Sequence, residues 1–260
     1  QNILQAFSDI STKAENKDRV LIYFAGHGNT YDLPEGGEMG YLLPVDGDNE
    51  NLFVTSIAMD DLKRISLMSK AKHLLYLVDA CYGGLLTIGA RGLDSKTTPN
   101  YIEKITKNKS RQIITAGGRG EQVIEKSEWG HSAFTLNLNR GLKEGNADFN
   151  TDGYITANEL GMFLSEKVTI DSENQQTPQY GRMTSQEGEF VFINSKLSTS
   201  EGNPFWIDGK KNNKSQKDFT LSQLGILEDN KISIHEWSKH EKEGASFNNF
   251  INYKQGIKYK

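Results

Sequence analysis

Residues 71–86, AKHLLYLVDACYGGLL, decide the fold of this chain. The apolar run from His73 to Val78 is typical of a strand that is covered on both faces. It leads directly into Asp79 and then into Cys81, the only cysteine of the chain, and two glycines follow soon after. Open α/β sheets place their chemistry at the carboxyl ends of their strands, so this segment predicts a sheet with Cys81 at its reactive edge. A lone cysteine is by itself more typical of inert core packing.

A second apolar strand ends in a histidine. Residues 18–28, DRVLIYFAGHG, contain a predicted strand from Val20 to Phe24, followed by His27 between two glycines. Parallel strands joined by a crossover place their carboxyl ends at one rim of the sheet. We therefore expect His27 and Cys81 to lie on the same rim, where the imidazole can accept the thiol proton.

The pair FAGHG and DACYGG, with YLLPVD between them, resembles the caspase-like cysteine peptidases. It is more similar to the metacaspase, paracaspase and bacterial caspase-like branch than to the animal caspases. In caspases the histidine lies about 50 residues before the nucleophile, and here the separation is 81 − 27 = 54. The resemblance covers roughly residues 1–193. It implies an α/β fold, a three-layer α/β/α sandwich with a mostly parallel sheet, and cysteine endopeptidase activity.

The resemblance also implies the roles of the residues at the rim. Cys81 would be the nucleophile, and His27 would take its proton and return it to the leaving amine. The backbone N–H groups of Gly28 and Cys81 would stabilise the oxyanion. The alternative is a catalytically silent protein that keeps the caspase fold as a calcium-binding interaction module, because a fold does not prove turnover.

Acidic residues predict the substrate preference. In the resembling family the position of Asp79 forms the floor of the primary specificity pocket, and a buried carboxylate there selects a cation. Glu121 lies where relatives place a second acidic pocket residue, with Glu125 as the alternative. The expected partner is a protein or peptide substrate with a basic P1 residue, cleaved after Arg or Lys. The competing interpretations are a turn-capping carboxylate at Asp79 and solvated loop charges at the two glutamates.

Residues 148–159, DFNTDGYITANE, match the EF-hand calcium loop. The pattern predicts a Ca²⁺ site, structural or regulatory, because its side-chain and carbonyl oxygens suit a hard cation. Its ligands would be Asp148, Asn150, Asp152, Tyr154 and Glu159. A helix connector of EF-like shape without metal is the alternative. Residues 225–236 repeat the pattern incompletely and predict no metal.

The expected organisation is a peptidase domain at 1–194 with an EF-hand-like insertion at about 131–168. A linker at 195–217 and a small helical appendage at 218–260, as a degenerate EF-hand, would follow. The family's first strands are missing here, so an N-terminal portion or a partner chain is expected to complete the sheet. Helices are predicted at 1–14, 55–70, 131–143 and 157–168, and strands at 20–24, 73–78, 112–116 and 189–193. Residues 29–51 are predicted as a polar loop.

Residues 89–111 are predicted as an exposed basic loop with a short helix, and as a site of self-cleavage. Arg91, Lys96 and Lys104 are the candidate cleavage points.

Bulk composition excludes several function classes. The net charge is 30 − 34 = −4, so no nucleic-acid or membrane partner is expected from electrostatics. A single cysteine allows no internal disulfide and fits a reducing compartment. No apolar run is long enough for a membrane span, and no signal-peptide pattern is present. We therefore expect a cytoplasmic protein.

Overall fold

The computed structural model describes residues 2–80, 101–118, 120–194 and 196, and the backbone of 206–207 and 210–211. The chain divides into two compact units, 1–201 and 202–260. In the second unit, β12 (Trp206–Ile207) pairs with β13 (Lys210–Lys211) in antiparallel fashion, within the predicted linker. The appendage predicted at 218–260 lies outside the described residues.

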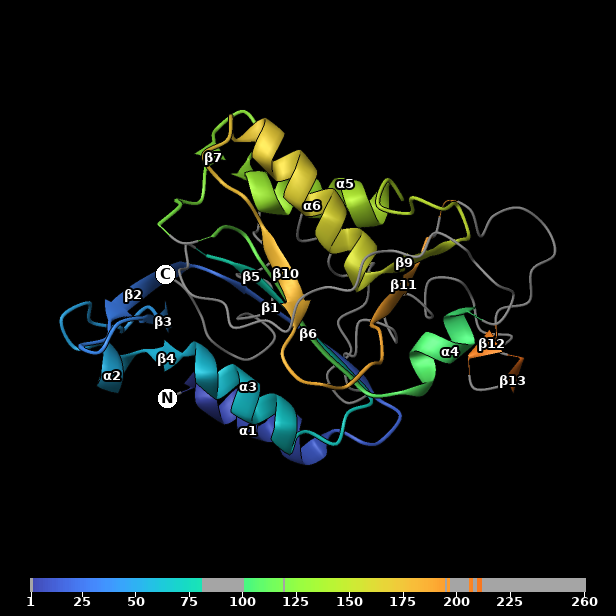
Figure 1. Cartoon of the computed structure of the whole chain (residues 1–260), viewed down its shortest axis with the longest axis horizontal. Coiled ribbons are helices and arrows are strands. Elements are labelled where there is room, and N and C mark those ends of the chain that lie inside the picture. The colour runs from blue at the N-terminus through green and yellow to red at the C-terminus, as the bar shows by residue number, and fades with distance from the viewer. Residues whose placement is uncertain are drawn as a thin grey trace, which may run out of the picture. The chain divides into compact units, whose positions relative to one another are not determined.

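A mostly parallel four-stranded sheet forms the centre of the first unit (Figure 1). Its order is β1 (Arg19–Ala25), β5 (His73–Asp79), β6 (Ser110–Thr115) and β10 (Gln179–Arg182). The first three strands are parallel, and β10 is antiparallel to β6. The predicted fold class is confirmed. Sequence reasoning missed β10, because its residues QYGR form no apolar run.

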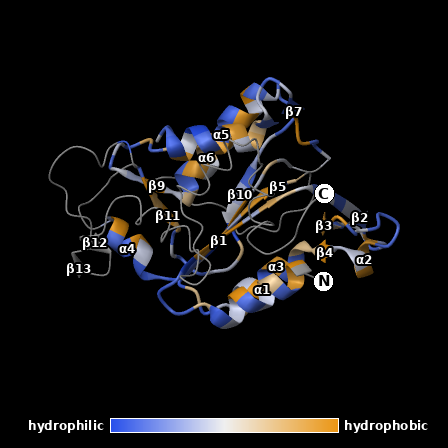
Figure 2. Ribbon diagram, turned by 180° about the vertical axis from the view of Figure 1, so that it is seen from behind, coloured by the Kyte–Doolittle hydropathy of each residue, from blue (hydrophilic) through white to orange (hydrophobic). Residues whose placement is uncertain are grey.

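Helices cover both faces of this sheet (Figure 1). Helices α1 (Asn2–Lys13) and α3 (Met59–Met68) lie on one face, and α5 (Ala133–Lys143) and α6 (Ala157–Asp171) lie on the other. In Figure 2 the sheet strands between these helices are largely hydrophobic. Because side chains alternate along a strand, every second residue of β5 faces α1 and α3.

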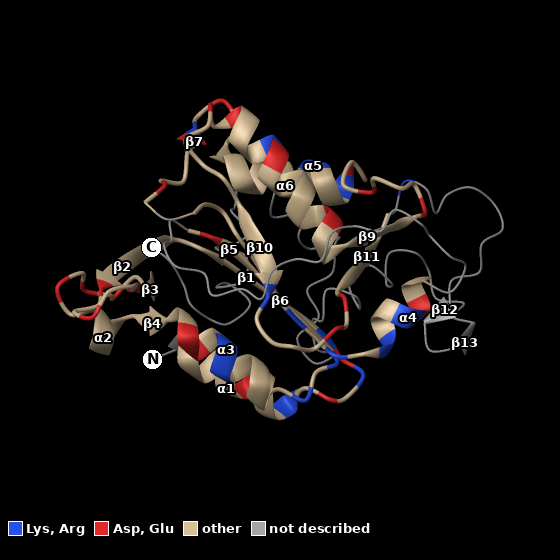
Figure 3. Ribbon diagram, viewed as in Figure 1, with Lys and Arg blue, Asp and Glu red and all other residues tan. Residues whose placement is uncertain are grey.

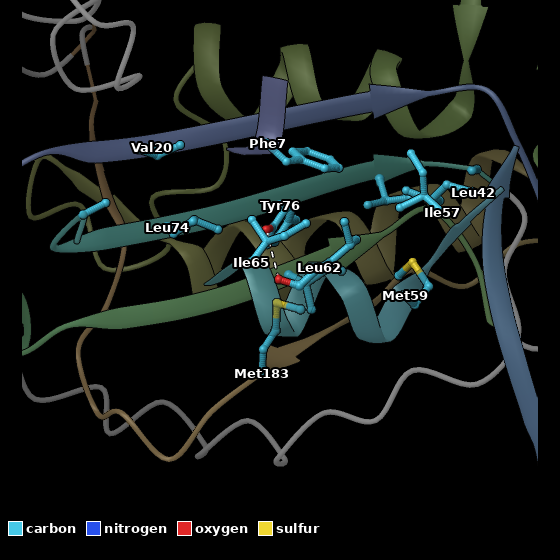
Figure 4. Close-up of a cluster of buried hydrophobic side chains, with 14 of the residues drawn as sticks. Phe7, Val20, Leu42, Ile57, Met59, Leu62, Ile65, Leu74, Tyr76 and Met183 are labelled. Carbon is cyan, nitrogen blue, oxygen red and sulfur yellow. Dashed lines mark hydrogen bonds between the residues drawn. The ribbon is translucent and has the colours of Figure 1, made fainter. Parts of the chain in front are cut away.

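The core lies between the sheet and the first pair of helices (Figure 4). Tyr76 is 1% exposed; its ring packs edge-on against Phe7, and its hydroxyl donates to the carbonyl of Leu62 at 3.1 Å. Burial of such large side chains contributes about 1.5–3 kcal/mol each. This packing holds β5, and therefore Asp79 at its carboxyl end, in place.

The predicted loop at 29–51 is wrong, because most of it forms a hairpin. Strands β2 (His27–Asp32), β3 (Glu38–Leu43) and β4 (Ile57–Ala58) form a small antiparallel sheet. Tyr41 and Leu42 of β3 are buried and face the core. The polar residues around this short apolar segment led to the prediction of a loop. Gly36 and Gly37 adopt φ of 90° and 93° at the turn, a conformation that favours glycine. The short helix α2 (Leu52–Thr55) follows.

The end of the predicted basic loop is also different from the prediction. Residues 81–100 lie outside the described residues, and α4 (Tyr101–Lys107) is the expected short helix. Arg111, however, is 2% exposed and belongs to β6. Its guanidinium donates to the carbonyls of Ser66, Ser69 and Ala71 at 2.7, 3.0 and 2.8 Å. Carbonyls at a helix carboxyl end carry partial negative charge, which stabilises this buried cation.

Two further strand pairs complete the first unit. β7 (Glu125–Lys126) pairs with β8 (His131–Ser132), so His131 precedes α5 rather than opening it. β9 (Tyr154–Thr156) pairs with β11 (Val191–Ile193). The last predicted strand therefore exists but lies outside the central sheet. In the described part of the chain, no helix has the length and apolar character needed to cross a membrane.

Candidate active site

The carboxyl ends of β1 and β5 lie side by side. Ala25 pairs with Asp79, and the N–H of Gly26 donates to the carbonyl of Asp79 at 3.1 Å. His27 follows immediately as the first residue of β2, and its side chain is exposed. The structure therefore places His27 at the rim where β5 ends. Cys81 lies outside the described residues, so the distance between imidazole and thiol stays a prediction.

The hairpin β2–β3 holds His27 and Gly28 in place. His27 lies opposite Leu43 and Gly28 opposite Leu42, which is buried. Pairing of β2 with β3 restricts the backbone that carries the His27 imidazole. The oxyanion role predicted for the Gly28 N–H stays a prediction.

Asp79 is buried at this rim and is held by hydroxyl groups from two other elements. It is 5% exposed, and its Oδ2 accepts hydrogen bonds from Ser132 Oγ at 2.5 Å and Thr135 Oγ1 at 2.6 Å. The hydroxyl of Tyr23, on β1, donates to the same oxygen at 3.3 Å. The other oxygen, Oδ1, is buried without a hydrogen-bond partner among the described residues.

The electrostatic state of Asp79 follows from this environment. Burial raises the pKa of the carboxyl, the three hydroxyl donors lower it, and the charge of Glu125 raises it again. Burial is the largest of these effects. A buried carboxylate with one unpartnered oxygen is costly, and a cationic ligand would relieve that cost.

The two candidate acidic partners of Asp79 differ in position. Glu121 accepts hydrogen bonds at Oε2 from the N–H groups of Gly118, at 2.7 Å, and Thr177, at 2.6 Å. This carboxylate therefore joins two loops. Glu125 is exposed on β7, and its charge raises the pKa of both Asp79 and Tyr23. The charge of Glu125 therefore contributes to the raised pKa of Asp79.

The three residues that donate hydrogen bonds to Asp79 were not predicted from the sequence. They are Tyr23, Ser132 and Thr135. Ser132 and Thr135 belong to the GHSAFT segment that begins α5, where Ser132 is the N-cap and accepts from the Thr135 N–H at 3.0 Å. An N-cap serine before a helix was the available signal. Nothing in the sequence indicated that its hydroxyl also reaches a strand end 53 residues earlier.

The loop at 148–159 is held by its own polar groups. Asp148, which is 7% exposed, accepts from the N–H groups of Asp152 and Gly153 and from Asn194 Nδ2 at 3.0 Å. Asn150 also accepts from the Asp152 N–H, and Asp152 accepts from the N–H of Tyr154 at 2.9 Å. The turn places the predicted ligands along one short loop.

Glu159 closes this loop and begins α6. Its Oε2 accepts from the N–H and hydroxyl of Thr156 in a capping box, whereas Oε1 is buried and has no hydrogen-bond partner in the described part of the chain. Burial, followed by the charges of Asp152 and Asp148, raises the pKa of Glu159 to about 7. Within the described ranges, no group of three or more His, Cys, Asp or Glu side chains is arranged to hold a metal ion.

Several predicted positions lie outside the described residues. They are Arg91, Lys96 and the incomplete repeat at 225–236. Lys104 is described, and it is exposed on α4.

Comparison with known proteins decides the family. Residues 1–187 match the model of the caspase domain family. This chain belongs to the caspase domain family. The match begins with α1 and includes β1, β5 and β6, the strands whose ends form the rim, together with His27, Asp79 and Cys81.

Of the two other comparisons, one found no match and one found a weak likeness. The curated proteins contain no match. Among solved structures, the crystal structure of a protein from Geobacter sulfurreducens is similar, with 13% sequence identity and a TM-score of 0.44. That likeness covers 72% of each chain. Membership of the caspase domain family rests on the family model.

Proposed function

We propose that this protein is a cysteine endopeptidase that cleaves after Arg or Lys, with His27 and Cys81 as its dyad. The observation that supports it is Asp79. This buried carboxylate, with one oxygen unpartnered among the described residues, lies two residues before the only cysteine and beside the strand that leads to His27.

The reaction would proceed in two steps at the rim. The Cys81 thiolate attacks the scissile carbonyl, and His27 gives its proton to the leaving amine as the C–N bond breaks. Water, deprotonated by His27, then hydrolyses the thioester and releases the thiol. The exposure of His27 suits this role, because the imidazole has to reach both substrate and water.

The preference for a basic residue follows from the charge at Asp79. A guanidinium or ammonium group would supply a hydrogen-bond donor to Oδ1, which has none among the described residues, and charge-assisted bonds are the strong ones. Glu125 adds negative potential nearby. A neutral or acidic side chain would leave the buried oxygen unpartnered, which costs about 1–3 kcal/mol or more.

Two measurements test this function. An arginyl chloromethylketone should label Cys81 covalently, and His27→Ala should abolish the labelling. Fluorogenic peptides that differ only in having Arg, Lys or Asp before the scissile bond should be compared. The Arg and Lys peptides should be cleaved faster than the Asp peptide. Preference for Asp would overturn the pocket. Absence of labelling in the folded protein would favour the silent interaction module.

We further propose that the loop at 148–159 binds Ca²⁺ through Asp148, Asn150, Asp152, the Tyr154 carbonyl and Glu159. The support is the buried Oε1 of Glu159, which has no partner within the described ranges and lies near two like charges. A divalent cation would supply positive charge to three acids that repel one another. Oxygen ligands of this kind suit a hard cation.

Calorimetric titration with calcium tests the loop. The wild type should release or absorb heat, and Glu159→Gln should weaken binding strongly. The matched control is Glu166→Gln, which removes an exposed charge from the same helix, where Glu166 pairs with Lys167 at 2.8 Å. Equal binding by the two variants, or no heat from the wild type, removes the site.

A further inference from the structure

A short surface segment beside His27 is unusually apolar for its exposure. We call residues 45–54, the loop after β3 and the start of α2, the 45–54 shoulder. Its side chains Val45, Phe53 and Val54 are 98%, 85% and 74% exposed. Single exposed apolar residues are ordinary, but large ones gathered on one short segment mark interaction surfaces.

The same shoulder is strongly acidic. Asp46, Asp48 and Glu50 are exposed, and none of the three forms an ion pair with a described residue. Residues 20–62 contain eight Asp or Glu and no Lys or Arg. Figure 3 shows this acidic character over the β2, β3 and α2 region. The partner that such a surface attracts carries positive charge.

The shoulder is anchored next to the candidate active site. It follows Leu43, which lies opposite His27 in the hairpin. Asn29, two residues after His27 and therefore on the same face of β2, donates through Nδ2 to Asn49 Oδ1 at 3.0 Å. The segment is also held internally, because the N–H of Asp48 donates to Thr55 Oγ1 at 2.9 Å.

We propose that the 45–54 shoulder is an exosite for the substrate polypeptide, and that it binds a segment in which Lys or Arg alternates with large apolar side chains. This inference rests on the proposed endopeptidase function and extends its preference for positive charge beyond the residue at Asp79. The occupant is the substrate rather than a second copy of this chain. A two-fold contact would bring this acidic surface against itself, and like charges repel.

The test measures binding separately from cleavage. Full-length Cys81→Ala protein is titrated against a fluorescent peptide of Lys and Arg interspersed with Leu and Phe, and anisotropy gives the Kd. The peptide should bind, and its affinity should fall as salt rises. Versions with Glu in place of the basic residues, or Ser in place of the apolar ones, should bind much more weakly.

Variants locate the binding surface. Asp46→Asn/Asp48→Asn/Glu50→Gln should weaken binding about tenfold and reduce its salt dependence, since each exposed charge contributes modestly. In the wild type, Asp48 Oδ1 accepts from the Glu50 N–H at 3.0 Å. Asp48→Asn retains an Oδ1 acceptor, so the loop should keep its shape. Phe53→Ser/Val54→Ser should weaken binding by a similar factor.

Matched controls lie away from the shoulder. Asp32→Asn/Glu35→Gln removes exposed charges at the far end of the β2–β3 hairpin, and Leu67→Ser/Met68→Ser removes side chains on α3 that are 61% and 66% exposed. Both should bind like the parent protein. The exosite is overturned if the shoulder variants bind normally, or if the controls lose as much affinity. A parent protein that forms dimers, together with a Phe53→Ser/Val54→Ser variant that is monomeric, would also overturn the exosite. The shoulder would then be a contact between two copies of this chain.

Turnover separates the exosite from the endopeptidase function. In the active enzyme, the shoulder variants should hydrolyse a short acyl-arginine coumarylamide at the wild-type rate and should lose efficiency only on the long basic peptide. A wild type that hydrolyses no Arg or Lys substrate overturns the endopeptidase function, whereas the peptide Kd values decide the exosite by themselves.

Discussion

The Thr135 hydroxyl lies 2.6 Å from Oδ2 of Asp79 and joins the first turn of α5 to the end of β5. A strand end that carries a buried carboxylate is thus connected directly to a helix on one face of the sheet. Ser132 and Tyr23 donate to the same oxygen, so three hydroxyls hold Asp79 in one orientation and leave Oδ1 available.

Removing one of these donors should change the pH dependence of Arg cleavage. Hydrogen bonds to the charged form lower the pKa of Asp79, so Thr135→Val should raise it. Cleavage after Arg needs the ionised carboxylate, so the acidic limb of kcat/KM should move to higher pH. Thr169→Val, which removes a hydroxyl that donates to the carbonyl of Ser165 within α6, is the control. An unchanged acidic limb in Thr135→Val would contradict the role assigned to Asp79.

The two glutamates near the rim should behave differently. Glu125→Gln removes a charge that raises the pKa of Asp79, so the acidic limb should move to lower pH and the preference for Arg over a neutral residue should shrink. Glu121→Ala should instead lower the melting temperature, because two backbone N–H groups lose their acceptor, at a cost of about 1–3 kcal/mol each if they stay buried. If Glu121→Ala moved the acidic limb and Glu125→Gln lowered the melting temperature, the roles of the two glutamates would be the reverse of those assigned.

Glu159 should make the stability of the metal-free protein depend on pH. Its pKa rises from 4.5 to about 7 on folding. The folded state therefore binds more protons than the unfolded state between these values, and the free energy of unfolding should fall as the pH rises through this window. Denaturant unfolding in a chelator should show that slope in wild type and a smaller one in Glu159→Gln. An identical slope in both proteins would exclude the effect.

Arg111 should be essential for stability. Replacement by Met removes the donors of at least three buried carbonyls at the end of α3, an effect of roughly 3–5 kcal/mol. Arg111→Lys should destabilise as well, since one ammonium cannot reproduce a planar fork of five N–H donors. Chemical denaturation gives both values. Replacing exposed Arg64, whose guanidinium pairs with Asp61 at 2.9 Å, should cost less than about 1 kcal/mol.

Self-cleavage should occur at Arg91 or Lys96 rather than at Lys104. Lys104 lies within α4, and peptidases act on extended rather than helical backbone, so its bond is protected. Mass spectrometry of the purified protein should find fragments ending at one of the first two positions. These fragments should be absent from Cys81→Ala. Identical fragments in both proteins would exclude self-cleavage.

Apolar strands were predictable, and polar-flanked strands were not. The strands β1, β5 and β6 could be predicted from their apolar runs, because strands covered on both faces need continuous apolar residues. The hairpin β2–β3 was missed because only Gly40, Tyr41 and Leu42 of β3 are fully buried. Arg111 was assigned to an exposed loop because a charged side chain gives no sign that helix-end carbonyls will surround it.

The mixed α/β class, the three apolar strands of the parallel part of the sheet and the place of His27 just after one of them could be read from the amino-acid sequence alone. Local hydrophobicity and glycine placement carry that information, because they act between neighbours in the chain. The hydroxyls that hold Asp79, the influence of the Glu125 charge on its pKa, and the acidic, apolar shoulder beside His27 became visible only in the folded structure. These relationships join residues up to 56 positions apart, and packing of helices against the sheet, not any local pattern, brings such residues together.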